Sequence, residues 1–144
     1  MTGERGLFTL PVRVYWEDTD AGGIVFYANY LKFFERARTE WLRSFGIEQR
    51  RLREERGGLF VVVESQVRYR RPARLDDILE VSARLEAAGH ASFTVAQHAL
   101  LKSERAESDA APLLCSARIR IGWVDAATLR PARIPQSILE VLQE

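Results

Sequence analysis

A chain of 144 residues can bury a hydrophobic core without disulfides or a structural metal, and we expect it to form one domain, residues 1–144. The 21 basic and 20 acidic residues give a net charge of +1, which creates no field strong enough to recruit nucleic acid. A lone cysteine, with no signal-like stretch and no run of roughly 20 apolar residues, favours a cytoplasmic protein without membrane insertion.

The first predicted elements are a strand and a long helix. Apolar and polar side chains alternate from Phe8 to Trp16, which is typical of a strand with one buried face. In residues 30–45 apolar side chains recur every three or four positions, which predicts a helix with a wide apolar stripe. The stripe consists of Tyr30, Phe33, Phe34, Ala37, Trp41, Leu42 and Phe45. Because most of these are large aromatics, the helix should form the core.

A short solvated helix and four more strands follow. The helix covers residues 48–56, the strands are predicted at 59–70, 79–86, 91–101 and 113–123, and residues 134–144 predict a terminal helix. Leu59, Val61 and Val63 are expected on one buried face, whereas Gln97 interrupts the apolar face of its strand. Short links predict antiparallel neighbours. We therefore expect an α+β fold in which a five-stranded antiparallel sheet wraps around the long helix.

The stretch EDTDAGGIVFYANY, residues 17–30, joins the first strand to that helix. As a calcium loop it lacks the glutamate expected at its twelfth position, which is Asn29. As a phosphate loop it lacks a Gly-Lys-Ser/Thr ending. His90 and His98 lie in or beside the fourth strand and Cys115 lies on an apolar strand face, so a serine or cysteine triad is not indicated. The remaining candidate for chemistry is a carboxylate.

Two interpretations of Asp18 and Asp20 stay open from the residues alone. An aspartate before a helix can simply cap its free N–H groups. Gly22 and Gly23 favour a catalytic acid instead, because glycines let the backbone approach a ligand closely. The helix N-terminus adds unpaired N–H donors and a partial positive charge, as an oxyanion hole requires. Together these are the parts needed for acyl transfer.

Three segments carry a resemblance to a known family. They are VRVYWEDTDAGGIVFYANYLKFFERARTEWLRSFGI, VRYRRPARLDD and ARIRIGWVDAATLRPARIP. They resemble acyl-CoA thioesterases of the 4-hydroxybenzoyl-CoA thioesterase type, in particular the branch associated with the Tol-Pal cell-envelope system. The resemblance implies a hotdog fold, in which the sheet wraps a central helix, and homodimers that often associate into homotetramers. It also implies hydrolysis of an acyl-CoA substrate, with no cofactor and no metal.

The resemblance places the catalytic carboxylate at Asp20, acting as a nucleophile that gives a mixed anhydride or as a general base for water. A helix N-terminus keeps Asp20 ionised and weakly basic, which favours the nucleophile, and Asp18 is expected to be structural. Many Tol-Pal-associated members carry histidine at the position of Tyr27. The hydroxybenzoyl-CoA enzymes have tyrosine there and use the nearby backbone amide to polarise the thioester carbonyl. We therefore expect Tyr27 in the catalytic site as a hydrogen-bond donor, not as a base at neutral pH.

The expected substrate contacts are Gly23, Ile24, Val25, Arg70, Arg71 and His90. The first three lie between the acid and the helix. The arginines end the second strand and can bind CoA phosphates, and relatives often have basic residues at the hairpin that contains the histidine. The sequence leaves open whether the acyl group is short aliphatic, long-chain or aromatic.

A second hypothesis is a non-hydrolytic module that binds acyl-CoA or an acyl carrier. A third, a hotdog dehydratase or hydratase, is disfavoured because those enzymes usually pair the aspartate with a histidine a few residues on. No histidine follows Asp20 at such a spacing.

Overall fold

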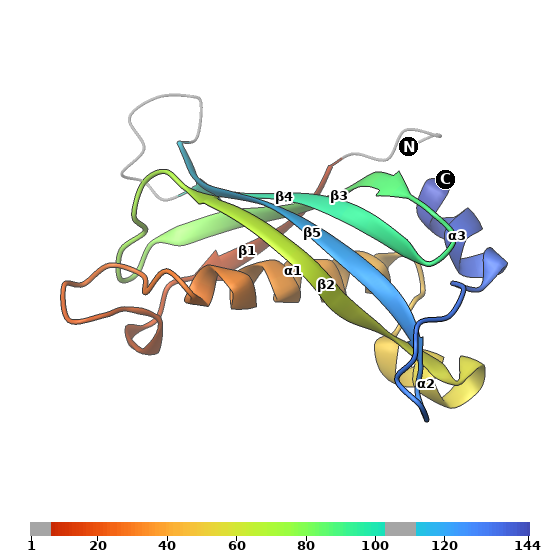
Figure 1. Cartoon of the computed structure of the whole chain (residues 1–144). Coiled ribbons are helices and arrows are strands. Elements are labelled where there is room, and N and C mark those ends of the chain that lie inside the picture. Colours follow the sequence, from red (N-terminus) through yellow and green to blue (C-terminus); the bar gives the residue numbers. More distant parts are fainter. Residues whose placement is uncertain (1–6, 103–111) are drawn as a thin grey trace.

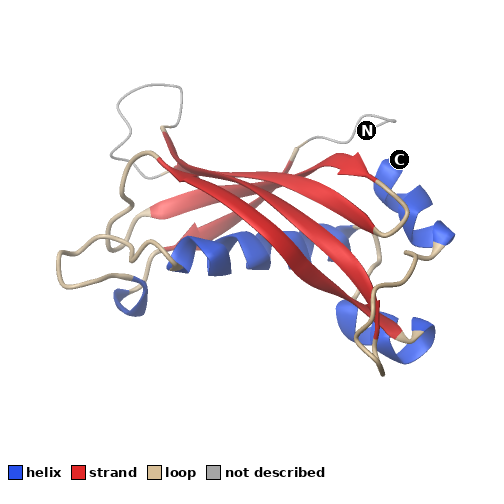
Figure 2. Cartoon of the chain, in the orientation of Figure 1, coloured by secondary structure: helices blue, strands red, loops and turns tan. Residues whose placement is uncertain are grey.

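The computed structural model of the chain describes residues 7–102 and 112–144. Its strands are β1 (Phe8–Arg13), β2 (Gly58–Tyr69), β3 (Ile78–Ala88), β4 (Ser92–Leu101) and β5 (Leu113–Asp125). Its helices are the 3-10 turn η1 (Trp16–Asp18), α1 (Asn29–Ser44), α2 (Gln49–Arg56) and α3 (Gln136–Gln143). The five strands, the long helix and the terminal helix agree with the sequence prediction (Figures 1 and 2).

All five strands form one antiparallel sheet in the order β1-β3-β4-β5-β2. The predicted hairpin between β3 and β4 is confirmed. The prediction that β2 and β3 are neighbours is wrong, because β2 pairs with β5 at one edge of the sheet. Residues 70–77, called here the β2–β3 connection, carry the chain from that edge across to β3. The length of a link therefore did not reveal that it crosses two strands.

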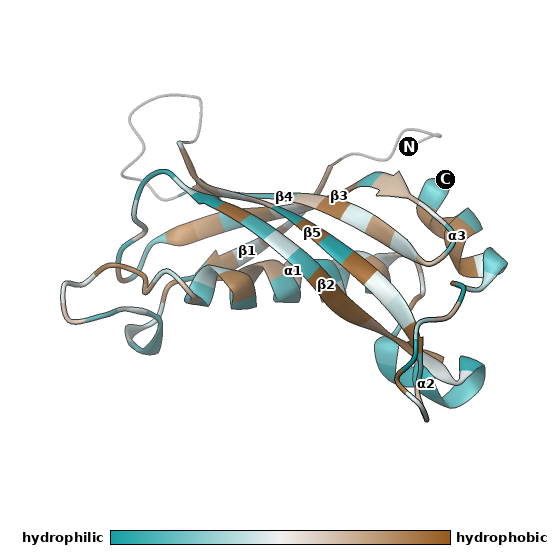
Figure 3. Cartoon of the chain, viewed as in Figure 1, coloured by the Kyte–Doolittle hydropathy of each residue, from teal (hydrophilic) through white to brown (hydrophobic). Residues whose placement is uncertain are grey.

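The sheet curves over α1, which lies along its inner face (Figures 1 and 2). Figure 3 shows hydrophobic and hydrophilic residues alternating along both α1 and β5. The buried residues of α1 are Tyr30, Phe33, Phe34, Ala37, Trp41 and Leu42. Full burial of an aliphatic or Phe side chain contributes about 1.5–3 kcal/mol before entropy is counted. This packing fixes α1 against the sheet and thereby fixes the loop that precedes it.

Two details of the strands differ from the alternation in the sequence. The register between β2 and β5 shifts between Val62 and Glu64, so a bulge at Val63 reverses the faces of β2. As a result Phe60 reaches the core and its ring lies 5.3 Å from that of Phe93, whereas Val63 is 50% exposed. The predicted burial of Trp16 is also wrong, because β1 ends at Arg13 and the indole is 80% exposed in η1.

Gln97, the polar residue expected on an apolar strand face, is completely buried. Its Nε2 donates to the carbonyl oxygens of Phe34 at 3.0 Å and Ser82 at 3.1 Å, and its Oε1 accepts from Arg38 Nη1 at 3.1 Å. A buried amide is tolerated when its donors and acceptors are paired in this way. The network joins the middle of α1 to β3 and β4.

Candidate active site

Asp18 is a structural residue of the loop between β1 and α1. Its side chain is 5% exposed and its Oδ2 accepts the backbone N–H of Tyr15 at 2.8 Å, which closes the η1 turn. Its carbonyl oxygen accepts the N–H of Phe26 at 3.0 Å and the Asn29 amide at 2.9 Å. Asp18 therefore holds the loop against the start of α1, as the sequence led us to expect.

Asp20 is exposed at the tip of the same loop. Its Oδ1 accepts the N–H of Gly22 at 2.8 Å, and its carbonyl oxygen accepts the N–H of Gly23 at 3.0 Å. Gly23 has a φ of 81°, which favours glycine because a Cβ would clash in that conformation. Asp20 Oδ2 makes no hydrogen bond with the described part of the chain, and the residue is exposed to solvent.

The β2–β3 connection braces the loop from the other side. The N–H of Val25 donates to the carbonyl oxygen of Ala73 at 2.9 Å, and the N–H of Leu75 donates to the carbonyl oxygen of Gly23 at 3.4 Å. The N–H of Ala73 in turn donates to the Tyr30 hydroxyl at 3.1 Å. Ala73 is fully buried, so this one residue ties the loop of residues 18–28, called here the acid loop, to the first turn of α1.

The N-terminus of α1 carries unpaired donors. Its N-cap is Ala28, and no side chain caps the helix, so neither Asp18 nor Asp20 satisfies the capping interpretation. Within the described residues the N–H groups of Tyr27 and Ala28 donate to no acceptor, whereas those of Gly23 and Val25 are occupied. The partial positive charge of the helix lies at these same two free groups. They are the donors best suited to an oxyanion.

Tyr27 belongs to an exposed aromatic cluster beside these donors. Its ring lies 4.9 Å from that of Phe26 and meets the ring of Tyr69 edge-on at 5.9 Å. Tyr69 also contacts Tyr30 at 5.7 Å, and burial raises the pKa of both of these phenols above the usual value. We did not single out Tyr69 from the sequence. Its place at the end of β2, just before the β2–β3 connection, is the signal that could have identified it.

A family model described as the thioesterase-like superfamily matches residues 14–142, which include the acid loop, α1 and all strands but β1. The chain belongs to this superfamily. The acyl-CoA thioester hydrolase YbgC of Escherichia coli O6:H1 is 42% identical over 92% of this chain and 93% of that protein. The acyl-CoA thioesterase YbgC of Haemophilus influenzae is 37% identical over 91% of this chain and 90% of its own. The crystal structure of a probable thioesterase from Bartonella henselae superposes with a TM-score of 0.80 at 31% identity, over 90% of this chain and 100% of that one.

The basic residues considered for CoA binding do not meet within one chain of this thioesterase-like protein. Arg70 and Arg71 directly follow β2, and both backbone N–H groups donate to the carbonyl oxygen of Leu114, near the acid loop. His90 lies in the β3–β4 hairpin at the opposite end of the sheet, where its Nδ1 is 3.2 Å from Arg133 Nη2. Within a single chain, Arg70 and Arg71 therefore cannot form one binding site together with His90.

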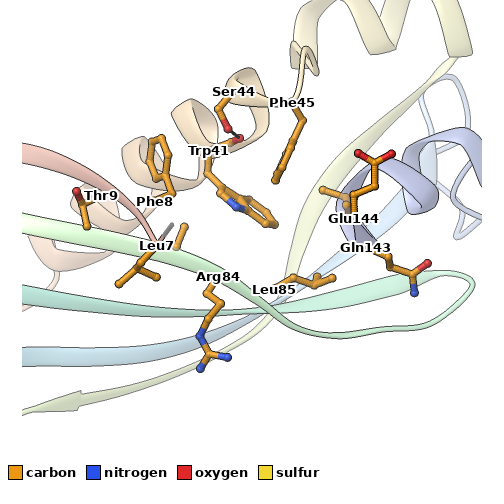
Figure 4. Close-up of a pocket in the computed structure, with 12 residues that line it drawn as sticks. Leu7, Phe8, Thr9, Trp41, Ser44, Phe45, Arg84, Leu85, Gln143 and Glu144 are labelled. Carbon is orange, nitrogen blue, oxygen red and sulfur yellow. Dashed lines mark hydrogen bonds between the residues drawn. The ribbon is translucent and has the colours of Figure 1, made fainter. Parts of the chain in front are cut away.

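A large groove of the thioesterase-like chain lies away from the acid loop. It has a volume of about 970 Å³ at the C-terminal end of α1, where Trp41 and Phe45 face Leu85 of β3 and the end of α3 (Figure 4). None of the loop residues from Asp18 to Ala28 lines it. Among the described residues no three His, Cys, Asp or Glu side chains gather to hold a metal ion, and no described helix has the length and apolarity to cross a membrane.

Proposed function

We propose that the chain is an acyl-CoA thioesterase, which hydrolyses a CoA thioester to a free carboxylic acid and CoA. The observation that carries this proposal is the exposed carboxylate of Asp20 in a braced loop that leads to the free N–H groups of Tyr27 and Ala28. A carboxylate and two fixed N–H donors are the groups that acyl transfer requires. The similarity to acyl-CoA thioester hydrolases over nine-tenths of the chain supports the same reaction.

Asp20 acts in one of two ways. As a nucleophile, its carboxylate adds to the thioester carbonyl carbon, the N–H groups of Tyr27 and Ala28 stabilise the oxyanion, and the CoA thiolate leaves. Water then cleaves the mixed anhydride, which releases the acid and restores Asp20. As a general base, Asp20 instead removes a proton from the attacking water, and that proton leaves with the thiol. The Tyr27 phenol can donate a hydrogen bond at the site in either case.

We base the proposed CoA contacts and the proposed association of chains on the positions of the basic residues. Arg70 and Arg71 are our candidates for the CoA phosphates, and Gly23, Ile24 and Val25 for the wall beside the thioester. His90 can join them only from a second copy of the chain, which supports a homodimer, with a homotetramer as the larger assembly. We also propose a cytoplasmic location, on the basis of the lone cysteine, and an association with the Tol-Pal system, on the basis of the family resemblance alone.

The test is release of thiol from a panel of acyl- and aroyl-CoA esters by wild type and Asp20→Asn. We expect Asp20→Asn to lower kcat/KM by about 100-fold or more with an unchanged melting temperature, because it removes the reacting carboxylate. Glu17→Gln, an exposed acid of the same loop, is the matched control and should stay near wild type. Hydrolysis by Asp20→Asn within a few-fold of wild type would overturn the proposal. Tight acyl-CoA binding without turnover by wild type would favour the non-hydrolytic module instead.

A further inference from the structure

A second cavity lies between the middle of α1 and the strands β2, β4 and β5. Its volume is about 150 Å³ and its apolar wall includes Phe60, Phe93 and Ile121. Arg38 lines it from α1, ten residues after Ala28, which places it about 15 Å along the helix from the free N–H groups. The cavity is therefore distinct from the acid loop.

Arg38 is a partly buried cation that forms no ion pair with any described Asp or Glu. Its Nη1 donates to Gln97 Oε1 at 3.1 Å. Glu35, an exposed acid of α1 that also lines the cavity, acts on Arg38 only through its charge, which raises the pKa of Arg38 and partly offsets the effect of burial. Burial lowers the pKa of Arg38, which shows that the apolar surroundings disfavour its charge. A guanidinium in such a place is costly unless an anion accompanies it.

Arg38 lines the cavity and has donors that no described group uses. Every buried side-chain nitrogen and oxygen of the described residues has a partner, so Nε and Nη2, which have none, keep contact with solvent. Gln97 holds the guanidinium in place, because its own Nε2 is fixed by the carbonyl oxygens of Phe34 and Ser82. The fork of donors is therefore already oriented before any ligand arrives.

We propose that this cavity binds a small carboxylate with an apolar body, and that Arg38 is its anion-binding group. Arginine binds carboxylates with two parallel hydrogen bonds, and the body of the ligand would pack on Phe60, Phe93 and Ile121. A cavity of about 150 Å³ is large enough for a benzene ring. The carboxylate can come from a free acid, or from the far end of a dicarboxylic acyl group. Only the second source rests on the proposed function.

Calorimetric titration with benzoate and hexanoate, beside the neutral benzyl alcohol and 1-hexanol, tests the site directly. We expect Arg38→Met to weaken carboxylate binding by about tenfold or more and to leave the neutral compounds unchanged. Arg36→Met, on the exposed side of α1, is the matched control. Carboxylate binding by Arg38→Met within twofold to threefold of wild type, or no binding by wild type, overturns the proposal.

A second variant guards against misfolding of Arg38→Met. Val62 is 51% exposed at the rim of the cavity, so Val62→Trp blocks the entrance without removing a buried hydrogen bond. We expect it to abolish carboxylate binding at an unchanged melting temperature. Undiminished binding by a folded Val62→Trp would place the ligand elsewhere and overturn the assignment.

Two further measurements separate the sources of the carboxylate. A fall of about tenfold in the ratio of kcat/KM for adipoyl-CoA over hexanoyl-CoA in Arg38→Met identifies the far end of the acyl group. An unchanged ratio with lost benzoate binding identifies a free-acid site. Titration of Asp20→Asn with benzoate isolates the cavity from the chemistry. If wild type hydrolyses no thioester but Arg38-dependent binding of benzoate persists, only the proposed function fails.

Discussion

The N-terminus and the middle of α1 differ in whether the polar groups around them are paired by hydrogen bonds. At its N-terminus the N–H groups of Tyr27 and Ala28 are unpaired within the described residues, and Asp20 is exposed in the loop that leads to them. At its middle the carbonyl oxygen of Phe34 and the amide of Gln97 are buried and fully paired. Unpaired groups at a helix end can stabilise charge that develops in a reaction, whereas paired groups in a core specify how the helix sits on the sheet. The comparison thus assigns chemistry to one half and positioning to the other.

Removing the paired amide should have the largest effect. Gln97→Leu removes the acceptor of Arg38 Nη1 and the buried donor to the carbonyl oxygens of Phe34 and Ser82, and we expect a loss of about 3 kcal/mol in the free energy of unfolding. Chemical denaturation measures it. Gln66→Leu, at an exposed position on β2, should stay within about 0.5 kcal/mol of wild type. Equal effects of the two variants would show that the buried network is not stabilising.

Removing one free donor should be almost as costly, but only to catalysis. Tyr27 is the second residue of the turn closed by the Asn29 N–H to the Phe26 carbonyl at 2.8 Å, a position at which proline is favoured. Tyr27→Pro and Tyr27→Ala both lose the ring, yet only proline loses the N–H. We expect kcat/KM of Tyr27→Pro to be about 100-fold below that of Tyr27→Ala. Similar values for both would remove this N–H from the oxyanion site.

The two aspartates of the loop should separate stability from activity. Asp18→Ala leaves the partly buried N–H of Tyr15 without its acceptor and should lower the free energy of unfolding by about 1–2 kcal/mol. Asp20→Ala loses only an exposed contact with Gly22 and should change stability by less than about 0.5 kcal/mol. Thermal and chemical unfolding of both variants check the difference. A stability loss in Asp20→Ala that matches Asp18→Ala would contradict the division of roles.

The smallest effect is expected from the Cys115 thiol, which lies between the exposed aromatic cluster and the core. Cys115 pairs with Tyr69 across the ladder, and burial raises the pKa of its thiol from 9.0 to about 12. The unfolded thiol ionises first, so its contribution to stability is complete below pH 9 and is lost between pH 9 and about 12. Between pH 8 and pH 10.5 wild type should lose more unfolding free energy than Cys115→Ala. Parallel losses would mean that the thiol is accessible.

Periodicity in the sequence was sufficient to predict the strands and α1, because burial on one face leaves a regular pattern. It could not locate β2, since pairing with β5 depends on the path of the β2–β3 connection, which the pattern does not record. One inserted residue at Val63 was enough to reverse a face. Family resemblance indicated Asp20 and Tyr27, but the free N–H groups and Tyr69 emerged only from backbone bonds and ring contacts. Gln97 stood out as an exception, and its partners came from two other segments, α1 and β3.

The bracing of the acid loop by Ala73 has a practical consequence for protein engineering. Residues 18–28 and 70–77 share hydrogen bonds through Val25, Ala73 and Tyr30, although they are remote in sequence. They form one cassette, so a graft or a randomised library that exchanges one segment must carry the other with it. Insertions in residues 70–77 should be tolerated far less than their surface position suggests, because that segment sets the geometry of the acid loop.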